Sequence, residues 1–76
     1  MNNQTTILEL RKNSKNQTKQ SVVAMEMSVQ EPAISKLERK TIRETSVDKL
    51  LRYVSAIGGT AELVVTLDNG EKIIVT

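Results

Sequence analysis

The stretch SVQEPAISKLERK, residues 28–40, decides how the rest of the chain is interpreted. Its apolar residues Ala33, Ile34 and Leu37 have the spacing of one side of a short amphipathic helix. A proline at position 32 suits the first turn of such a helix, where backbone N–H groups have no intrahelical partner. We expect the three apolar residues to be buried and the opposite side to present Glu31, Ser35, Lys36 and Arg39. Such a face is either a solvated surface or a surface that recognises a ligand.

The composition excludes several classes of function. The 76 residues correspond to one small domain with a limited core. The chain has no cysteine for disulfides, thiolate zinc sites or thiol nucleophiles, and no histidine, the usual general base and metal ligand. We therefore expect a protein that is not an enzyme, with no catalytic residue, no metal site and no cofactor. No apolar stretch approaches the roughly 20 residues that span a bilayer, so we expect a cytoplasmic protein without a membrane partner.

Two short helices are expected before the opening stretch. The first fits residues 5–12 and is followed by a polar segment with the composition of a loop. The second begins at Thr18 or Lys19 and ends at Met27, and Val22, Val23 and Met27 recur at helical spacing and are expected to face inward.

A further helix is expected after the opening stretch. The segment TIRETS, residues 41–46, is polar and is expected to be irregular. Ser46 then provides a favourable N-cap, and Gly58-Gly59 ends the helix. Tyr53 is expected to be a half-buried packing residue. The apolar stripe of this helix is assigned to the core or to a dimer interface, and it consists of Val47, Leu50, Leu51, Val54 and Ile57.

The last sixteen residues, AELVVTLDNGEKIIVT, change from helical spacing to alternation and predict a β-hairpin. A two-residue Asn69-Gly70 loop would scatter the apolar groups over both faces. A three-residue loop with Gly70 in the left-handed region pairs Val65 with Ile73, and we prefer this register. A lone hairpin is marginal in water, so it must dock on the helices or pair with another chain. The preferred register places Leu63, Val65, Leu67, Ile73 and Val75 on one face, and Glu62, Val64, Thr66, Lys72, Ile74 and Thr76 on the other.

Charge is unevenly distributed along the chain. Residues 1–43 hold eight Lys or Arg and four Glu, a balance of +4, whereas residues 44–76 hold three basic and five acidic residues, a balance of −2. A basic half and an acidic half suggest two surfaces with different partners, although a small domain also acquires such asymmetry by chance.

Residues 20–39, with the pattern Q-x-x-V-A-x-x-M-S-V-Q-E-P-A-I-S-K-L-E-R, resemble the helix-turn-helix of the Xre/Cro-repressor family. Residues 46–65, SVDKLLRYVSAIGGTAELVV, are similar to the tail of small Xre-type antitoxins of the HigA/HipB-like kind. The resemblance covers about residues 18–67. It implies a mainly α fold, a four-to-five-helix bundle with a C-terminal β-hairpin. Residues 1–57 would form the DNA-binding helical domain, and residues 58–76 a dimerisation or partner-binding extension of the same domain.

The sequence departs from the family pattern at three places. Ser28 occupies a turn position where the family has Gly, which favours a left-handed backbone. Lys19 stands where the family has a capping Thr, so Thr18 is expected to cap the second helix one residue earlier. The loop before this helix is about two residues longer than in the family. None of these departures lies on the expected recognition helix.

The resemblance implies a DNA interface centred on residues 30–43. Lys36 could donate to guanine and Glu31 could accept from cytosine. We expect Glu38 to pair with a nearby Arg or Lys and to stabilise the fold. The base-reading candidates are Gln30, Glu31, Pro32, Ser35 and Lys36, and the phosphate candidates are Lys19, Gln20, Arg39, Lys40 and Arg43.

The function implied is a sequence-specific transcriptional repressor. It would bind a palindromic double-stranded operator as a homodimer and serve as the antitoxin of an operon that it represses, with a basic protein toxin as partner. The alternatives are a stand-alone phage or mobile-element repressor, or a toxin-neutralising module without DNA binding. The candidates for the dimer or partner interface are Leu50, Val54, Val64 and Ile74.

Overall fold

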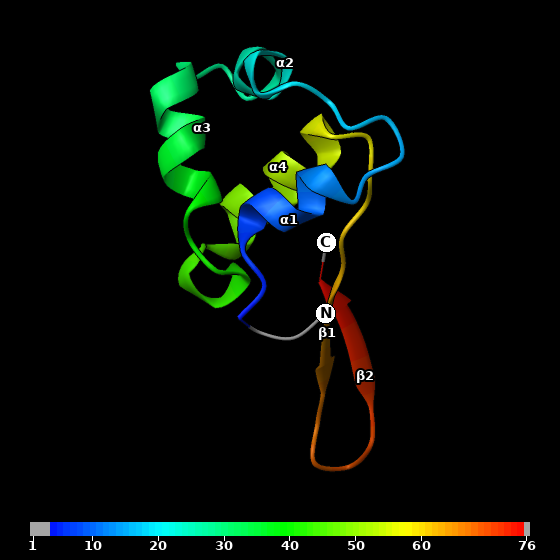
Figure 1. Ribbon diagram of the computed structural model, residues 1–76. Coiled ribbons are helices and arrows are strands. Elements are labelled where there is room, and N and C mark those ends of the chain that lie inside the picture. The colour runs from blue at the N-terminus through cyan, green and yellow to red at the C-terminus, as the bar shows by residue number, and fades with distance from the viewer. Residues whose placement is uncertain (1–3, 76) are drawn as a thin grey trace.

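The computed structural model describes residues 4–75, so the expected position of Thr76 on the hairpin lies outside the described residues. Within this range four α-helices and one 3₁₀ helix form a single body, and an antiparallel hairpin projects from it (Figure 1). This architecture confirms the predicted fold class. The elements are α1 (Ile7–Lys12), α2 (Gln20–Glu26), α3 (Glu31–Glu38), η1 (Ile42–Glu44), α4 (Val47–Ala56), β1 (Leu63–Thr66) and β2 (Lys72–Val75).

The core lies where the four α-helices meet, with α2 packed on α3 and α4 and with α1 packed on α3. Two residues expected inside are exposed. Val22 precedes Val23 by one position, so only one of the two can face the core, and Val23 lies one turn before buried Met27. Ala33 is exposed because the buried side of α3 comprises Ile34 and the residues three and four positions later. The buried apolar residues are Ile7, Val23, Ala24, Met27, Ile34, Leu37, Tyr53 and Ile57.

The N-terminal segment pairs with the chain that follows α3. Helix α1 begins at Ile7, two residues later than expected, because Thr6 is extended and forms a β-bridge with Thr41. The backbone N–H of Ile7 donates to the carbonyl of Lys40 at 2.9 Å, and that of Ile42 donates to the carbonyl of Thr5 at 3.0 Å. These bonds attach residues 5–7 to the end of α3 and to η1.

The segment after α3 is more ordered than predicted. Residues 42–44 form the 3₁₀ helix η1, and the expectation of irregular structure over residues 41–46 is wrong in this part. The side chain of Glu44 accepts from the backbone N–H of Thr41 at 3.0 Å and from its hydroxyl group at 2.9 Å. This local carboxylate–backbone bond lowers the pKa of Glu44 and fixes the turn between α3 and α4.

Helix α4 begins and ends where the sequence predicts. The hydroxyl group of Ser46 accepts from the backbone N–H of Lys49 at 3.2 Å, which confirms the N-cap. Gly58, with a φ of +88°, follows the helix, and the N–H of Gly59 donates to the carbonyl of Val54 at 2.9 Å.

The hairpin has the predicted three-residue loop and register. Val65 pairs with Ile73, and Leu63 pairs with Val75. Gly70 has a φ of +86°, and the N–H of Leu67 donates to the carbonyl of Glu71 at 2.8 Å. The strand residues alternate as expected, so Leu63, Val65, Ile73 and Val75 share one face, and Val64 and Ile74 lie on the other.

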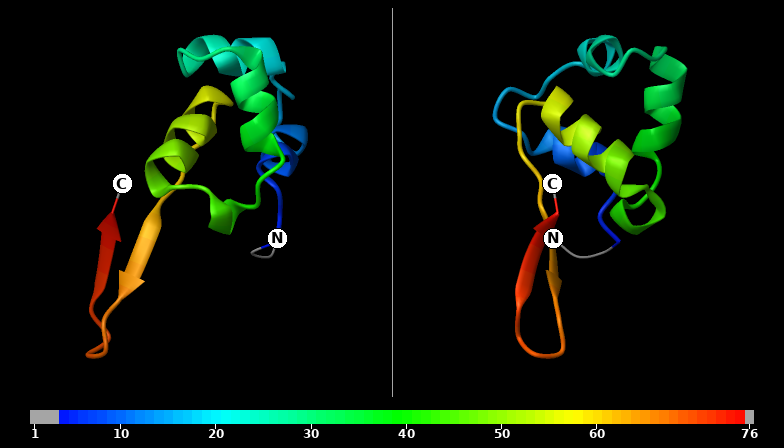
Figure 2. Two further views of the ribbon diagram at one scale, coloured as in Figure 1. Left: turned by 90° about the vertical axis from the view of Figure 1, so that its left-hand side faces the viewer. Right: turned by 180° about the vertical axis from the view of Figure 1, so that it is seen from behind.

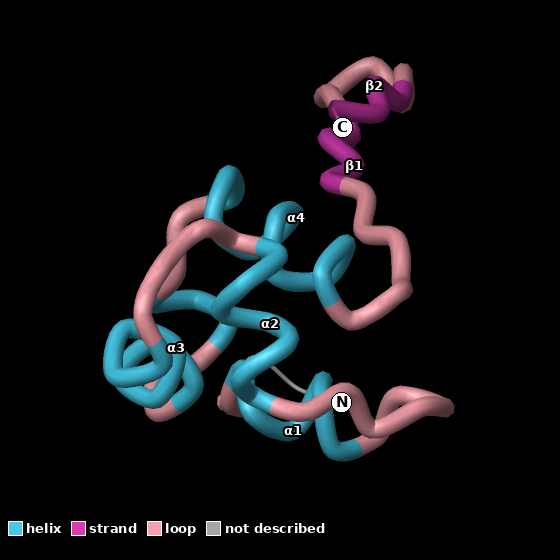
Figure 3. The backbone as a smooth tube through the Cα atoms, turned by 90° about the horizontal axis from the view of Figure 1, so that it is seen from above, coloured by secondary structure: helices cyan, strands magenta, loops and turns pink. Residues whose placement is uncertain are grey.

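The hairpin extends away from the helices in all views (Figures 1, 2 and 3), which makes the described chain elongated, 44 × 22 × 21 Å. Both strands are exposed along their whole length, Val64 and Ile74 most of all, at 50% and 60%. Neither face is covered by the helices of the same chain. Among the described residues no helix is both long and apolar enough to cross a membrane.

Candidate nucleic-acid interface

The turn between α2 and α3 sets the direction of the expected recognition helix. Ser28 has a φ of +58°, so it adopts the left-handed backbone that is expected where the family has a glycine. The N–H of Ser28 donates to the carbonyl of Met25 at 3.1 Å, and the N–H of Val29 donates to that of Ala24 at 3.0 Å. The guanidinium of Arg52 on α4 donates to the carbonyl of Met27 at 3.0 Å. These bonds satisfy the C-terminal carbonyls of α2 and hold it against α4.

Helix α3 presents most of its polar side chains to solvent. Pro32 lies in the first turn, as expected, and Gln30 is the N-cap. All five base-reading candidates are accessible, with Ser35 half-buried and the others exposed: Gln30, Glu31, Pro32, Ser35 and Lys36.

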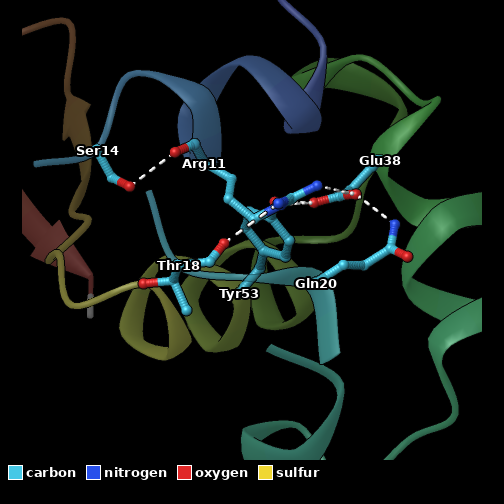
Figure 4. Close-up of polar contacts among 6 residues, drawn as sticks. All are labelled: Arg11, Ser14, Thr18, Gln20, Glu38 and Tyr53. Carbon is cyan, nitrogen blue, oxygen red and sulfur yellow. Dashed lines mark hydrogen bonds and ion pairs between the residues drawn. The ribbon is translucent and has the colours of Figure 1, made fainter. Parts of the chain in front are cut away.

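A buried polar junction lies under α3 and is centred on Glu38, which is 3% exposed (Figure 4). The guanidinium of Arg11 on α1 donates to both oxygens of Glu38, at 2.5 and 3.0 Å. The side-chain amide of Gln20 on α2 donates to Oε1 at 2.9 Å, and the hydroxyl group of Tyr53 on α4 donates to Oε2 at 2.5 Å. The prediction that Glu38 pairs with a basic residue is confirmed. The junction takes one side chain from each of the four α-helices.

The electrostatics of this junction keep Glu38 ionised. Burial alone would raise the pKa of Glu38, but hydrogen bonds from Arg11, Tyr53 and Gln20 outweigh it and hold the pKa below its ordinary value. The hydrogen bond to Glu38 raises the pKa of Arg11. Burial, and then the hydrogen bond to Glu38, raises the pKa of Tyr53. The prediction of a half-buried Tyr53 is wrong, because its ring is fully buried to bring its hydroxyl group to the carboxylate.

The start of α2 differs from the expected cap. The N-cap is Lys19, which makes no side-chain capping bond, so the expectation of Thr18 as the cap is wrong. The carbonyl of Thr18 instead accepts from Arg11 at 3.2 Å, which places the loop before α2 against the junction. The side-chain amide nitrogen of Gln20 donates to Glu38. Its backbone N–H and its amide oxygen are therefore the groups through which it could contact a ligand.

The basic residues after α3 lie on a fixed segment. Arg39 is the C-cap of α3, and Arg43 belongs to η1; both are exposed. Lys40 is half-buried, and its backbone carries the bond to Ile7. Backbone hydrogen bonds to α1 and within the turn before α4 therefore fix the segment that carries these three phosphate candidates.

A second candidate surface lies around the hairpin and α4. Leu50 and Val54 are half-buried and line a groove of about 600 Å³ together with Leu10 and Ile42. Val64 and Ile74 pair with each other on the opposite side of the hairpin from its apolar face. The four interface candidates of the sequence therefore fall into two places: Leu50 and Val54 on the helical body, and Val64 and Ile74 on the hairpin.

Most of the polar junction could not be predicted from the sequence. The sequence predicts a basic partner for Glu38 but identifies neither Arg11 nor Tyr53 as its partners, and it predicts only a phosphate contact for Gln20. The signal available was the single aromatic residue of a small chain, since a buried tyrosine requires a hydrogen-bond partner for its hydroxyl group.

Comparisons with known proteins agree with this geometry. A family model described as a helix-turn-helix domain matches residues 4–66. Curated proteins give no match. A solved structure described as "Induced DNA bending by unique dimerization of HigA antitoxin" is 29% identical, with a TM-score of 0.77 over 95% of this chain and 92% of that chain. Another, described as "DNA bound antitoxin HigA3", is 30% identical, with a TM-score of 0.77 over 93% of this chain and 88% of that chain. The fold is thus shared with HigA antitoxins, and the chain belongs to the helix-turn-helix domain family.

Proposed function

We propose that the chain is a sequence-specific DNA-binding repressor and the antitoxin of a toxin–antitoxin operon. The observation that carries this proposal is the exposed face of α3, held by the Glu38 junction in a fold shared with a DNA-bound antitoxin. A helix of this kind enters the major groove, where each base pair has a distinct pattern of donors and acceptors.

The exposed face of α3 supplies the groups that would distinguish bases. Lys36 would donate to O6 and N7 of guanine, and Glu31 would accept from N4 of cytosine. Gln30 and Ser35 would bond base edges, and Pro32 would contact a thymine methyl group. These five side chains lie on two consecutive turns, which suits the reading of adjacent base pairs.

The surrounding basic residues would position the protein on the phosphate backbone. Arg39, Lys40 and Arg43 lie beyond the C-terminal end of α3, and Lys19 and Gln20 lie at the start of α2. For Gln20 we assign the contact to the backbone N–H, since its amide nitrogen is used by Glu38. Phosphate contacts at the start of α2 and after the end of α3 would fix the position of α3 in the major groove.

The repressor would act as a homodimer on a palindromic operator. The apolar face of the hairpin is exposed, and a second copy is the occupant that two-fold symmetry provides. Leu50 and Val54, beside the root of the hairpin, would extend this interface along the groove on α4. A relative whose structure is described by its unique dimerization supports this assignment. Two copies of α3 would then read two half-sites related by the same symmetry.

The opposite face of the hairpin would bind the toxin. Val64 and Ile74 would provide apolar contact there, and the alternation of side chains would place Glu62 on the same face. The balance of −2 over residues 44–76 favours a basic partner, because charge complementarity raises the association rate and selects the partner. Co-expression with the neighbouring gene product tests this assignment. A tag on this chain should co-purify the toxin, and Val64→Lys should abolish co-purification while the dimer persists.

Footprinting on the DNA upstream of the protein's own gene tests the proposed function as a whole. We expect two protected half-sites with two-fold symmetry, separated by a whole number of helical turns. A footprint without a co-purifying partner would identify a stand-alone repressor. A co-purifying partner without any footprint would identify a toxin-neutralising module that does not bind DNA.

A further inference from the structure

A second groove, of about 250 Å³, lies between α3 and α4 beside the turn of the helix-turn-helix. Five apolar residues line it, and two of them, Val29 and Ala33, are exposed; the other three are Met27, Ile34 and Leu37. The remaining lining residues are basic and come from both helices and the segment after α3: Lys36, Lys40, Lys49 and Arg52. None of the described residues that line the groove is acidic. A lining of apolar and basic residues without a carboxylate suits a ligand that has both apolar and anionic groups.

The four cations are not neutralised equally by the protein. Arg52 donates to the carbonyl of Met27 and lies 4.0 Å from Asp48, so part of its capacity is used within the fold. Within residues 4–75, no carboxylate forms an ion pair with Lys36, Lys40 or Lys49. The backbone of Lys49 is fixed by its bond to the N-cap Ser46, at 3.2 Å. Among the described residues Lys49 is therefore an exposed cation without an ion pair, on the capped first turn of α4.

We propose that this groove holds a stretch of the operator's phosphate backbone and that Lys49 is a DNA-positioning residue. This proposal rests on the proposed DNA binding and extends its surface from α3 onto α4. Lys36 makes the groove continuous with the exposed face of α3, because it is both a base-reading candidate and a lining residue of the groove. The backbone that borders the base pair at Lys36 then passes along Lys40 and Lys49, while Val29 and Ala33 contact deoxyribose carbons. Phosphate contacts of this kind set orientation and carry no sequence information.

The test is the salt dependence of DNA binding by the full-length protein and its Lys49→Ala variant. Log affinity falls with log salt, and each lost phosphate contact makes this decline less steep by about 0.9 per bound copy. Raising the salt concentration from 50 to 200 mM should therefore weaken the variant about threefold to fourfold less per copy than the unmodified protein. Affinity should fall by the same factor for operator and random DNA. Lys72→Ala is the matched control, because it removes the same charge from the projecting hairpin.

Each outcome decides the proposal. The proposal for the groove is overturned if Lys49→Ala has the same salt dependence as Lys72→Ala while Arg43→Ala makes the salt dependence less steep. The proposed function would then remain intact. A loss confined to the operator also overturns it, since Lys49 would then read bases. Unchanged DNA binding with loss of a co-purifying acidic protein assigns the groove to that protein instead. No DNA binding by the unmodified protein refutes the proposed function itself. Thermal unfolding of all variants checks that the fold is retained.

Discussion

The hydroxyl group of Tyr53 on α4 donates a hydrogen bond of 2.5 Å to Glu38 on α3, across the centre of the helical body. The carboxylate that receives this bond is also held by Arg11 and Gln20. The angle of α3 relative to the other helices therefore depends on a polar contact as well as on apolar packing.

Replacing Tyr53 by phenylalanine tests this contact. The variant keeps the buried ring but removes one donor from a buried carboxylate, and we expect the free energy of unfolding to fall by about 1–3 kcal/mol. Urea unfolding measures the change. Thr45→Val is a control, because it removes a hydroxyl group that donates at 3.1 Å to the carbonyl of Thr41 at a less buried position, and its effect should be smaller. Equal effects of the two substitutions would contradict the central role of the bond.

The stability of the fold should depend on pH through Glu38. Its pKa in the folded state lies below the ordinary value of 4.5, so its contribution is fully present above that value and is lost as pH falls through the folded pKa. Glu38→Gln should lower stability at pH 7 and flatten its decline below pH 4.5. Urea unfolding over a pH series measures both effects, with the exposed Glu26→Gln as control. A variant whose decline with acid is as steep as that of the unmodified protein would refute the assignment.

Ser28→Gly should stabilise the protein. A left-handed backbone strains a serine but not a glycine, and relief of this strain should exceed the entropy that glycine adds to the unfolded chain. We expect a gain of about 0.5–1 kcal/mol in the free energy of unfolding. Ser55→Gly, at an exposed position within α4, should have the opposite sign because glycine weakens a helix. If Ser28→Gly and Ser55→Gly lower the free energy of unfolding by equal amounts, the turn at Ser28 is unstrained.

Substitutions at Lys36 and Arg43 should separate base reading from phosphate contact. Lys36→Ala should lose about 1–3 kcal/mol at the operator, mainly through one base position. Arg43→Ala should weaken binding to all sequences and flatten the salt slope by about one unit. Titrations on operator, single-base variants and random DNA measure the difference. The assignment fails if the two variants behave alike on every DNA.

Ile73→Lys should dissociate the proposed dimer. The substitution places a charge on the apolar face of the hairpin, and burying an unpaired charge opposes association. Sedimentation equilibrium should show a monomer and a weaker affinity for the operator. Val64→Lys, on the opposite face, should leave the dimer intact. If only Val64→Lys dissociates the dimer, the two faces have been assigned the wrong way round.

The sequence predicts local features better than relations between distant residues. The register of the hairpin followed from one glycine and the alternation of its apolar residues, and the cap at Ser46 followed from the chemistry of that residue. Both are decided within a few positions of the chain. The bridge between Thr6 and Thr41 could not be predicted in this way, because it joins two polar segments whose proximity arises only after the helices pack.

The candidate interface shows the same division. The order of residues along α3 placed its polar side chains on the exposed side, but periodicity alone put Ala33 inside and left Glu38 without a definite partner. Burial of Glu38 depends on Arg11, which lies 27 positions earlier in the chain. The spacing of residues along α3 contains no information about a hydrogen-bond donor on another helix.

The Glu38 junction takes side chains from all four α-helices, so the helix-turn-helix of α2 and α3 cannot be transplanted alone. A peptide of residues 20–38 would retain the turn and every base-reading candidate but would lose Arg11 and Tyr53. Its helices, of seven and eight residues, are too short to persist alone in water. Moving the exposed face of α3 to another scaffold therefore requires the whole helical body, whereas its exposed residues can be changed in place.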